Sequence, residues 1–141
     1  MEDQIFKGLS LGAPYISMIA IGRAAMAAAM AGKRAGELIA KGDIPKDLQK
    51  YGNSLSDIYR DVRLLRDTYG FDADNISPGA IGVFSYINRV STGLRQMMAL
   101  NRKFALDKID RTDIIALTKE AGEVSGISTI MDYRNRIREM I

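Results

Sequence analysis

The stretch Tyr15–Ala40, which reads YISMIAIGRAAMAAAMAGKRAGELIA, decides the fold that the sequence predicts. Small and apolar residues recur in it at alternating steps of three and four, which is the spacing of one face of an α-helix. Charged residues gather on the opposite face. Because Ala and Gly place little bulk between two backbones, we expect this face to be a helix-packing or oligomer interface. Its residues are Met18, Ile21, Ala25, Ala28, Gly32, Ala35, Gly36 and Ile39.

The partner of this small-residue face is open to two interpretations. In the first, the helix is the central member of a bundle that the chain forms by itself. In the second, it associates with another copy or docks on the helix of another protein. Met26 and Met30 fall among the charges on a helical wheel, so we expect them to be exposed partner contacts unless a further chain covers them.

Local signals give the limits of the first two helices. A proline suits the first turn of a helix and a glycine its end, so Pro14 and Gly42 predict a helix over about 14–41. A second heptad seam predicts a helix over 46–69. Since Gly52 and Asn53 interrupt this seam, the helix begins at residue 54 in the alternative interpretation, with Ser54 as its N-cap.

The remaining helices follow from the same signals. A serine and a proline at 77–78 predict the start of a helix over 77–106, whose seam contains Asn101. A buried Asn on such a seam sets the register of helix association, whereas in the alternative interpretation the seam ends before Asn101. Two further helices are predicted over 111–123 and 127–139, with one continuous helix as the alternative.

No alternating strand pattern or long linker interrupts these 141 residues. The predicted fold class is therefore all-α, a single helical domain over 1–141. We expect an elongated up-and-down bundle of four or five helices with coiled-coil-like heptad packing.

The composition argues against most chemistry. The chain contains no Cys and no His, so it lacks thiolates, the usual general base near neutral pH and the commonest zinc ligand. The sequence Asp72-Ala73-Asp74-Asn75 begins like a calcium loop, but Ile76 and Pro78 do not continue it. We expect no enzyme activity, no cofactor and no metal site.

The charge pattern leaves two other functional classes as alternatives. The net charge of +3 comes from 20 basic and 17 acidic residues that are interleaved, so nucleic-acid binding is an alternative carried only by three arginines. A membrane-associated subunit with residues 14–32 in the bilayer is the other alternative. It is opposed by Arg23, which costs about 2.5–3.5 kcal/mol in mid-membrane. The three arginines, as candidate anion contacts, are Arg134, Arg136 and Arg138.

The pattern as a whole favours a non-enzymatic structural or assembly subunit. We expect it to form a homo-oligomer or to bind other helical subunits through the small-residue helix. By analogy alone, such a protein fits a phage, secretion or conjugation assembly. The acidic start Met-Glu-Asp-Gln does not resemble a signal peptide, so a cytoplasmic or virion-associated location is expected.

Overall fold

A computed structural model describes residues 1–139, and over these residues the fold is all-α, as predicted. The described chain has no β-strand, although Ala116 and Thr129 form one isolated bridge. Coiled-coil packing of the helices stays a prediction. The α-helices are α1 (Glu2–Gly12), α2 (Arg23–Lys41), α3 (Lys46–Gln49), α4 (Leu55–Ile58), α5 (Val62–Tyr69), α6 (Pro78–Leu100), α7 (Lys119–Ser125) and α8 (Ile130–Glu139), and the 3-10 helices are η1 (Gly70–Asn75), η2 (Leu106–Lys108) and η3 (Arg111–Asp113).

Contacts between residues divide the chain into two compact units. Unit 1 contains Met1–Ile19 and the chain from Thr92 onward, and unit 2 contains Ala20–Ser91. Each unit has its own cluster of buried apolar side chains. The two units are therefore described separately.

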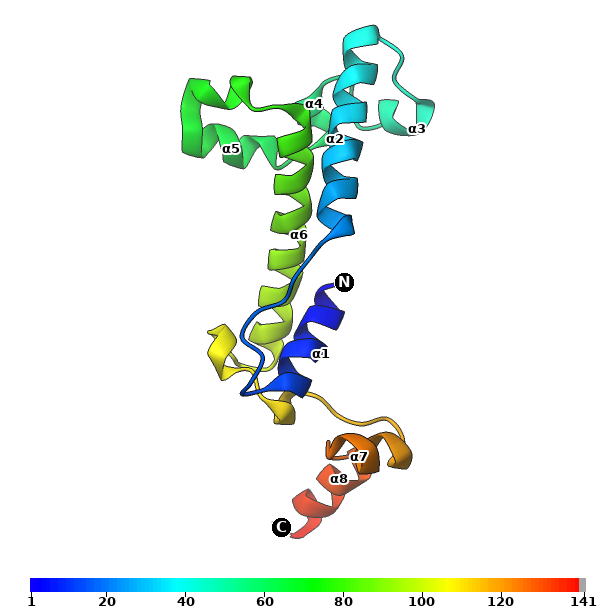
Figure 1. Ribbon diagram of the computed structural model, residues 1–141, viewed down its shortest axis with the longest axis vertical. Helices are drawn as coiled ribbons and strands as arrows, with labels where there is room; N and C mark the ends of the chain where they lie inside the picture. The colour runs from blue at the N-terminus through cyan, green and yellow to red at the C-terminus, as the bar shows by residue number, and fades with distance from the viewer. Residues whose placement is uncertain (140–141) are drawn as a thin grey trace. The chain divides into compact units, whose positions relative to one another are not determined.

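In unit 1, helix α1 lies along the last turns of α6 (Figure 1). The buried cluster joins Phe6 and Leu9 of α1 to Met98 of α6 and to Ile109, which follows η2. Burying four such side chains supplies about 1.5–3 kcal/mol each. This cluster holds the chain after α6 against the N-terminal helix.

In unit 2, helix α2 and the first half of α6 lie side by side (Figure 1). The buried cluster consists of Val62 and Leu65 of α5 and Ile81 of α6. The Nδ2 atom of Asn88 donates a hydrogen bond of 3.1 Å to Oδ1 of Asp61, which fastens α6 to the residue that precedes α5. The short helices α3, α4 and α5 are thus attached to the α2–α6 pair.

The predicted helix over 14–41 is wrong in its first part. Residues 13–22 are not helical, whereas the preceding residues form α1, which the pattern did not predict. Pro14 cannot continue α1 because it lacks a backbone N–H and its ring clashes with the preceding turn. The residues after it include three β-branched isoleucines and Gly22, which lower helix propensity. Helix α2 ends as predicted, with Gly42 in the left-handed region at φ 70°.

The predicted helix over 46–69 is three short helices. Gly52 has φ 126°, which a helix does not accept, and Tyr59 is also non-helical at φ −106° and ψ 89°. The alternative start near Ser54 is confirmed, since the Asp57 N–H donates to Ser54 Oγ over 3.2 Å and the Ser54 N–H donates to Asp57 Oδ2 over 3.1 Å. The heptad seam predicted over residues 46–69 therefore does not lie on a single helix.

The later helices are shorter than predicted. Helix α6 starts at Pro78 as expected but ends at Leu100 instead of residue 106, because Arg102 turns the chain at φ 54°. The predicted helix over 111–123 is η3 followed by non-helical residues and α7. The helix predicted over 127–139 begins at Ile130 and is separate from α7, so one continuous helix is excluded.

None of the described helices combines the length and the apolar character needed to cross a membrane.

Candidate interaction surfaces

The crossing of α2 and α6 brings backbone against backbone. A Cβ atom placed on Gly32 would lie 2.2 Å from the Pro78 carbonyl oxygen, and one on Gly82 would lie 2.3 Å from the Ala28 carbonyl oxygen. Real Cβ atoms do not approach other atoms so closely. One on Gly36 would lie 2.6 Å from the Pro78 ring. The partner of the Gly-rich part of the small-residue face is therefore α6 of the same chain.

The other residues of the small-residue face lie on a helix only from Arg23 onward. Ala35 is buried like Gly32, and Ala25, Ala28 and Ile39 are half-buried. Met18 is 84% exposed and Ile21 half-buried, and both precede α2. The prediction that these two residues lie on the helix is wrong, because the helix starts only after Gly22.

The outer face of α2 carries two large apolar side chains. Met26 is 69% exposed and Met30 is 65% exposed, as expected for residues placed among charges. Lys33 on the same helix is exposed, and Arg34 forms an exposed ion pair with Glu37, the Nη1–Oε2 distance being 3.7 Å. Unbranched thioether chains suit contacts with varied surfaces. This face therefore offers adaptable apolar contacts with a charged margin.

A hollow of about 530 Å³ lies in unit 2 between α2, α3, α4 and α6, and we call it the tyrosine hollow. Ala28 and Ala31 of α2 form part of its apolar lining. Two carboxylates in it are held by their own chain. Ser54 donates hydrogen bonds to Asp57 and thereby lowers the pKa of that carboxyl group, while Asp61 accepts from Asn88. The polar lining residues are Tyr51, Asp57, Tyr59, Arg60, Asp61, Ser85, Tyr86 and Arg89.

A second feature of unit 2 is the end of α5 with the following η1, which we call the aromatic knob (residues 67–74). Phe71 at its centre is 96% exposed, and Tyr69 is exposed as well. Asp74 pairs with Arg66, with 3.2 Å between Oδ1 and Nη2. A fully solvated Phe costs free energy that contact with another surface recovers. The sequence pattern indicates only an incomplete calcium loop at residues 72–75 and does not reveal that Phe71 is exposed.

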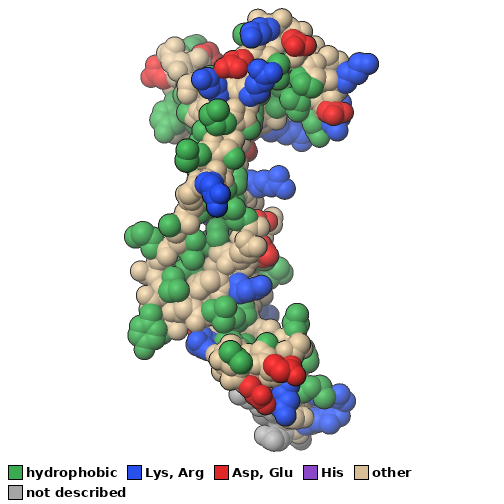
Figure 2. All heavy atoms as spheres, turned by 45° about the vertical axis from the view of Figure 1, so that its right-hand side comes forward, with side chains coloured by type: hydrophobic (Ala, Val, Ile, Leu, Met, Phe, Trp, Pro, Cys, Tyr) green, Lys and Arg blue, Asp and Glu red, His purple; other side chains and the backbone are tan. Residues whose placement is uncertain are grey.

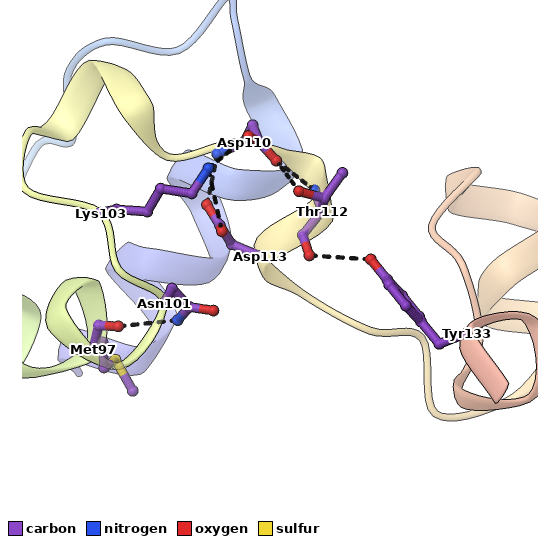
Figure 3. Close-up of polar contacts among 7 residues, drawn as sticks. All are labelled: Met97, Asn101, Lys103, Asp110, Thr112, Asp113 and Tyr133. Carbon is purple, nitrogen blue, oxygen red and sulfur yellow. Dashed lines mark hydrogen bonds and ion pairs between the residues drawn. The ribbon is translucent and has the colours of Figure 1, made fainter. Parts of the chain in front are cut away.

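Unit 1 carries a polar cluster after α6. Lys103 lies between two carboxylates, with its Nζ atom 2.8 Å from Asp110 Oδ2 and 3.6 Å from Asp113 Oδ1 (Figure 3). The hydrogen bond from Lys103, joined by those from Thr112, lowers the pKa of Asp110 to about 2. The same contact raises the pKa of Lys103. Asp113 Oδ2 also accepts a hydrogen bond of 2.8 Å from the Asp110 N–H, so these contacts together hold the loop that follows α6.

Asn101 does not occupy the seam on which it was predicted. It follows the end of α6, is exposed, and donates from Nδ2 to the Met97 carbonyl oxygen over 2.9 Å (Figure 3). Its amide therefore closes the last turn of the helix. The prediction of a register-setting residue on a packed seam is wrong for this reason.

Arg111 is a structural residue that the sequence did not reveal. Its guanidinium donates from Nη1 to the Leu11 carbonyl oxygen over 3.0 Å and from Nη2 to the Ser125 carbonyl oxygen. One side chain thus joins the end of α1 to the end of α7. A single arginine in a short polar segment carries no spacing signal, so only the fold identifies it.

The candidate anion contacts lie on α8. Arg134 and Arg138 are exposed, whereas the side chain of Arg136 lies outside the part that the structure describes. Among the described side chains, no group of three acidic residues is placed to hold a metal ion.

Comparison with known proteins gives no relative for this arrangement: no family model, curated protein or solved structure matches the chain.

Proposed function

We propose that this protein is a non-enzymatic structural subunit of a helical assembly, and that it associates with further helical chains, above all its own copies. The observation that carries the proposal is the surface area of the chain. Two compact domains of half its mass would together expose about 8,700 Å², even without touching each other. The chain exposes 10569 Å².

The surplus of about 1,900 Å² exceeds the area of about 800 Å² that each partner contributes to a standard protein–protein interface. Large apolar side chains contribute to it, and Figure 2 shows hydrophobic side chains spread over the visible surface between charged ones. Scattered apolar residues are normal on soluble proteins. Side chains as exposed as Met18, Phe71 and Phe104 in one short chain favour coverage by a partner.

Within this proposal the two faces of α2 have separate roles. The glycine face packs on α6, and the outer face with Met26 and Met30 is left for another chain. Association through the outer face does not require α2 and α6 to separate. This retains α2 as an associating helix but moves the contact away from its glycines.

Light scattering coupled to size exclusion, over about 1–100 μM protein, tests the proposal. We expect a mass that exceeds 15.5 kDa and rises with concentration. Met30→Glu should lower this mass because it puts a charge into the contact. Ala80→Glu is the matched control, since Ala80 is an exposed position in the first turn of α6 where Glu is well tolerated. A mass of one chain at every concentration would contradict self-association.

A further inference from the structure

We infer that two copies of this chain pair through residues 16–21, which we call the strap, as antiparallel β-strands. The strap lies in the connection between α1 and α2. The inference rests on the proposed self-association and adds a second contact to the one at the outer face of α2. Its partner is defined by main-chain chemistry, because an added strand is held first by its N–H and C=O groups.

The main chain of the strap has no partner within its own chain. From Ile16 to Gly22 the chain forms no helix, turn or bend. Among the described residues, no N–H or C=O group from Ser17 to Ile21 takes part in a hydrogen bond. A row of unpaired main-chain groups of this kind is a template for pairing with another extended chain.

The side chains of the strap alternate in exposure as those of a half-covered strand do. Met18 is 84% exposed and Ala20 is exposed, whereas Ile19 is 36% exposed and Ile21 is half-buried. The Cδ1 atom of Ile19 lies 3.3 Å from the position of a Cβ atom added to Gly8, so this side chain packs on α1. Since two paired strands are stable only when they pack on further structure, this support by a helix favours the pairing.

A second extended stretch of the chain shows the contrast between a paired and an unpaired strand. The Ala116 N–H donates a hydrogen bond of 3.0 Å to the Ser128 carbonyl oxygen, and Ala116 forms a bridge with Thr129. Ala116 is also buried. That stretch finds its strand partner within the chain, so the strap is the extended stretch that is left for another chain.

The composition of the strap suits pairing with an identical segment. It reads ISMIAI, with three β-branched isoleucines and without charge, glycine or proline, which is typical of segments that pair as strands. In an antiparallel pair of identical segments, residues near the two-fold axis face their own copies, and like charges there would repel. The strap has no charge to oppose this arrangement. A second copy also offers the same number of N–H and C=O groups.

Cross-linking is the first test, and it is clean because the chain has no cysteine of its own. A disulfide requires two Cα atoms within about 7 Å, which identical residues of two copies reach only near the two-fold axis. We expect at least one of Ser17→Cys, Met18→Cys and Ala20→Cys to give a covalent dimer in oxidised glutathione, about tenfold faster than Phe104→Cys. Phe104 is the matched control, since it is 86% exposed. Equal rates for all four variants would overturn the strap contact.

A proline variant is the second test, made in the Met30→Glu protein so that the outer face of α2 is blocked. This protein should still reach a mass of two chains in light scattering. Adding Ile19→Pro, which removes an N–H group, should weaken that dimer about tenfold or more, because the bond is lost twice in a two-fold contact. Ile19→Ala is the control, since it shortens the side chain but keeps the N–H group.

The outcomes separate the strap contact from the proposed function. An equal loss with Ile19→Ala and Ile19→Pro would overturn strand pairing, because the side chain alone would then explain it. A Met30→Glu protein that is monomeric while the unaltered chain associates would overturn the strap contact and leave the proposed function standing. If the unaltered chain is monomeric at every concentration, the proposed function itself fails.

Discussion

The two parts of the predicted helix over residues 14–41 share one spacing of small and apolar residues but differ in structure. From Arg23 to Lys41 the chain is helical and its glycines touch the backbone of α6. From Tyr15 to Gly22 it is not helical, and Tyr15 and Met18 are largely exposed. Spacing alone therefore does not make a helix pack. A helix also needs a neighbouring surface on which to pack. The start of α6, with Pro78, Gly79 and Gly82, provides such a surface for α2.

Glycine replacement in the packed part should have the largest effect. Gly32→Ala places a Cβ atom against the Pro78 carbonyl oxygen, so we expect the free energy of unfolding to fall by about 1–3 kcal/mol. Gly22→Ala is the control, because no atom lies within 4 Å of its added Cβ. Urea unfolding of both variants measures the difference. Equal midpoints for the two would refute the close crossing.

A second prediction asks whether the polar contacts of Arg111 stabilise unit 1 as the close glycine contacts stabilise unit 2. Arg111→Ala removes the hydrogen bonds to the Leu11 and Ser125 carbonyl oxygens and should cost about 1 kcal/mol of unfolding free energy. Arg111→Lys keeps the charge but cannot reach both carbonyl groups, so it should restore stability only in part. Full recovery with Lys would show that charge alone matters.

A smaller, pH-dependent effect is expected from Asp110. Its pKa is lowered from 3.8 to about 2 in the folded chain, so its contribution is complete above pH 4 and disappears as the pH falls through 2. Because the side chain is 47% exposed, solvent screening limits this contribution to about 1 kcal/mol or less. Urea midpoints at several pH values should fall more steeply between pH 4 and 2 for the unaltered chain than for Asp110→Asn. If the midpoints of the two proteins fell in parallel with pH, Asp110 would not contribute to the pH dependence of stability.

The smallest effect on the unfolding free energy is expected in residues 15–22, the non-helical part of the predicted helix. Met18→Ser changes a solvated side chain, so the unfolding free energy should move by less than about 0.5 kcal/mol. Any larger loss, measured on protein dilute enough to be monomeric, would mean that Met18 is packed within the chain. That result would mean that residues 15–22 are packed within the chain as α2 is.

Signals confined to a few residues predicted the structure best. The N-cap at Ser54, the start of α6 at Pro78 and the glycine end at Gly42 are all present. Each depends on hydrogen bonds or dihedral angles within one turn, which the local sequence determines.

Features that depend on distant residues were not predictable in this way. The break at Tyr59 and the helical start of the chain depend on tertiary packing, which periodicity does not encode. Among the candidate surfaces, the spacing placed the α2 glycines correctly on one face. The tyrosine hollow combines residues from four helices, and the exposure of Phe71 follows from the turn that carries it. Neither leaves a pattern in the sequence.

The glycines of the α2–α6 crossing also limit how this protein can evolve. A bulky substitution in an ordinary core is often rescued when a neighbouring side chain becomes smaller. At Gly32 and Gly82 the opposing atoms belong to the main chain, so no second substitution can make room. A larger residue at either position has to push the two helices apart, so we expect Gly32 and Gly82 to tolerate substitution less than the positions around them.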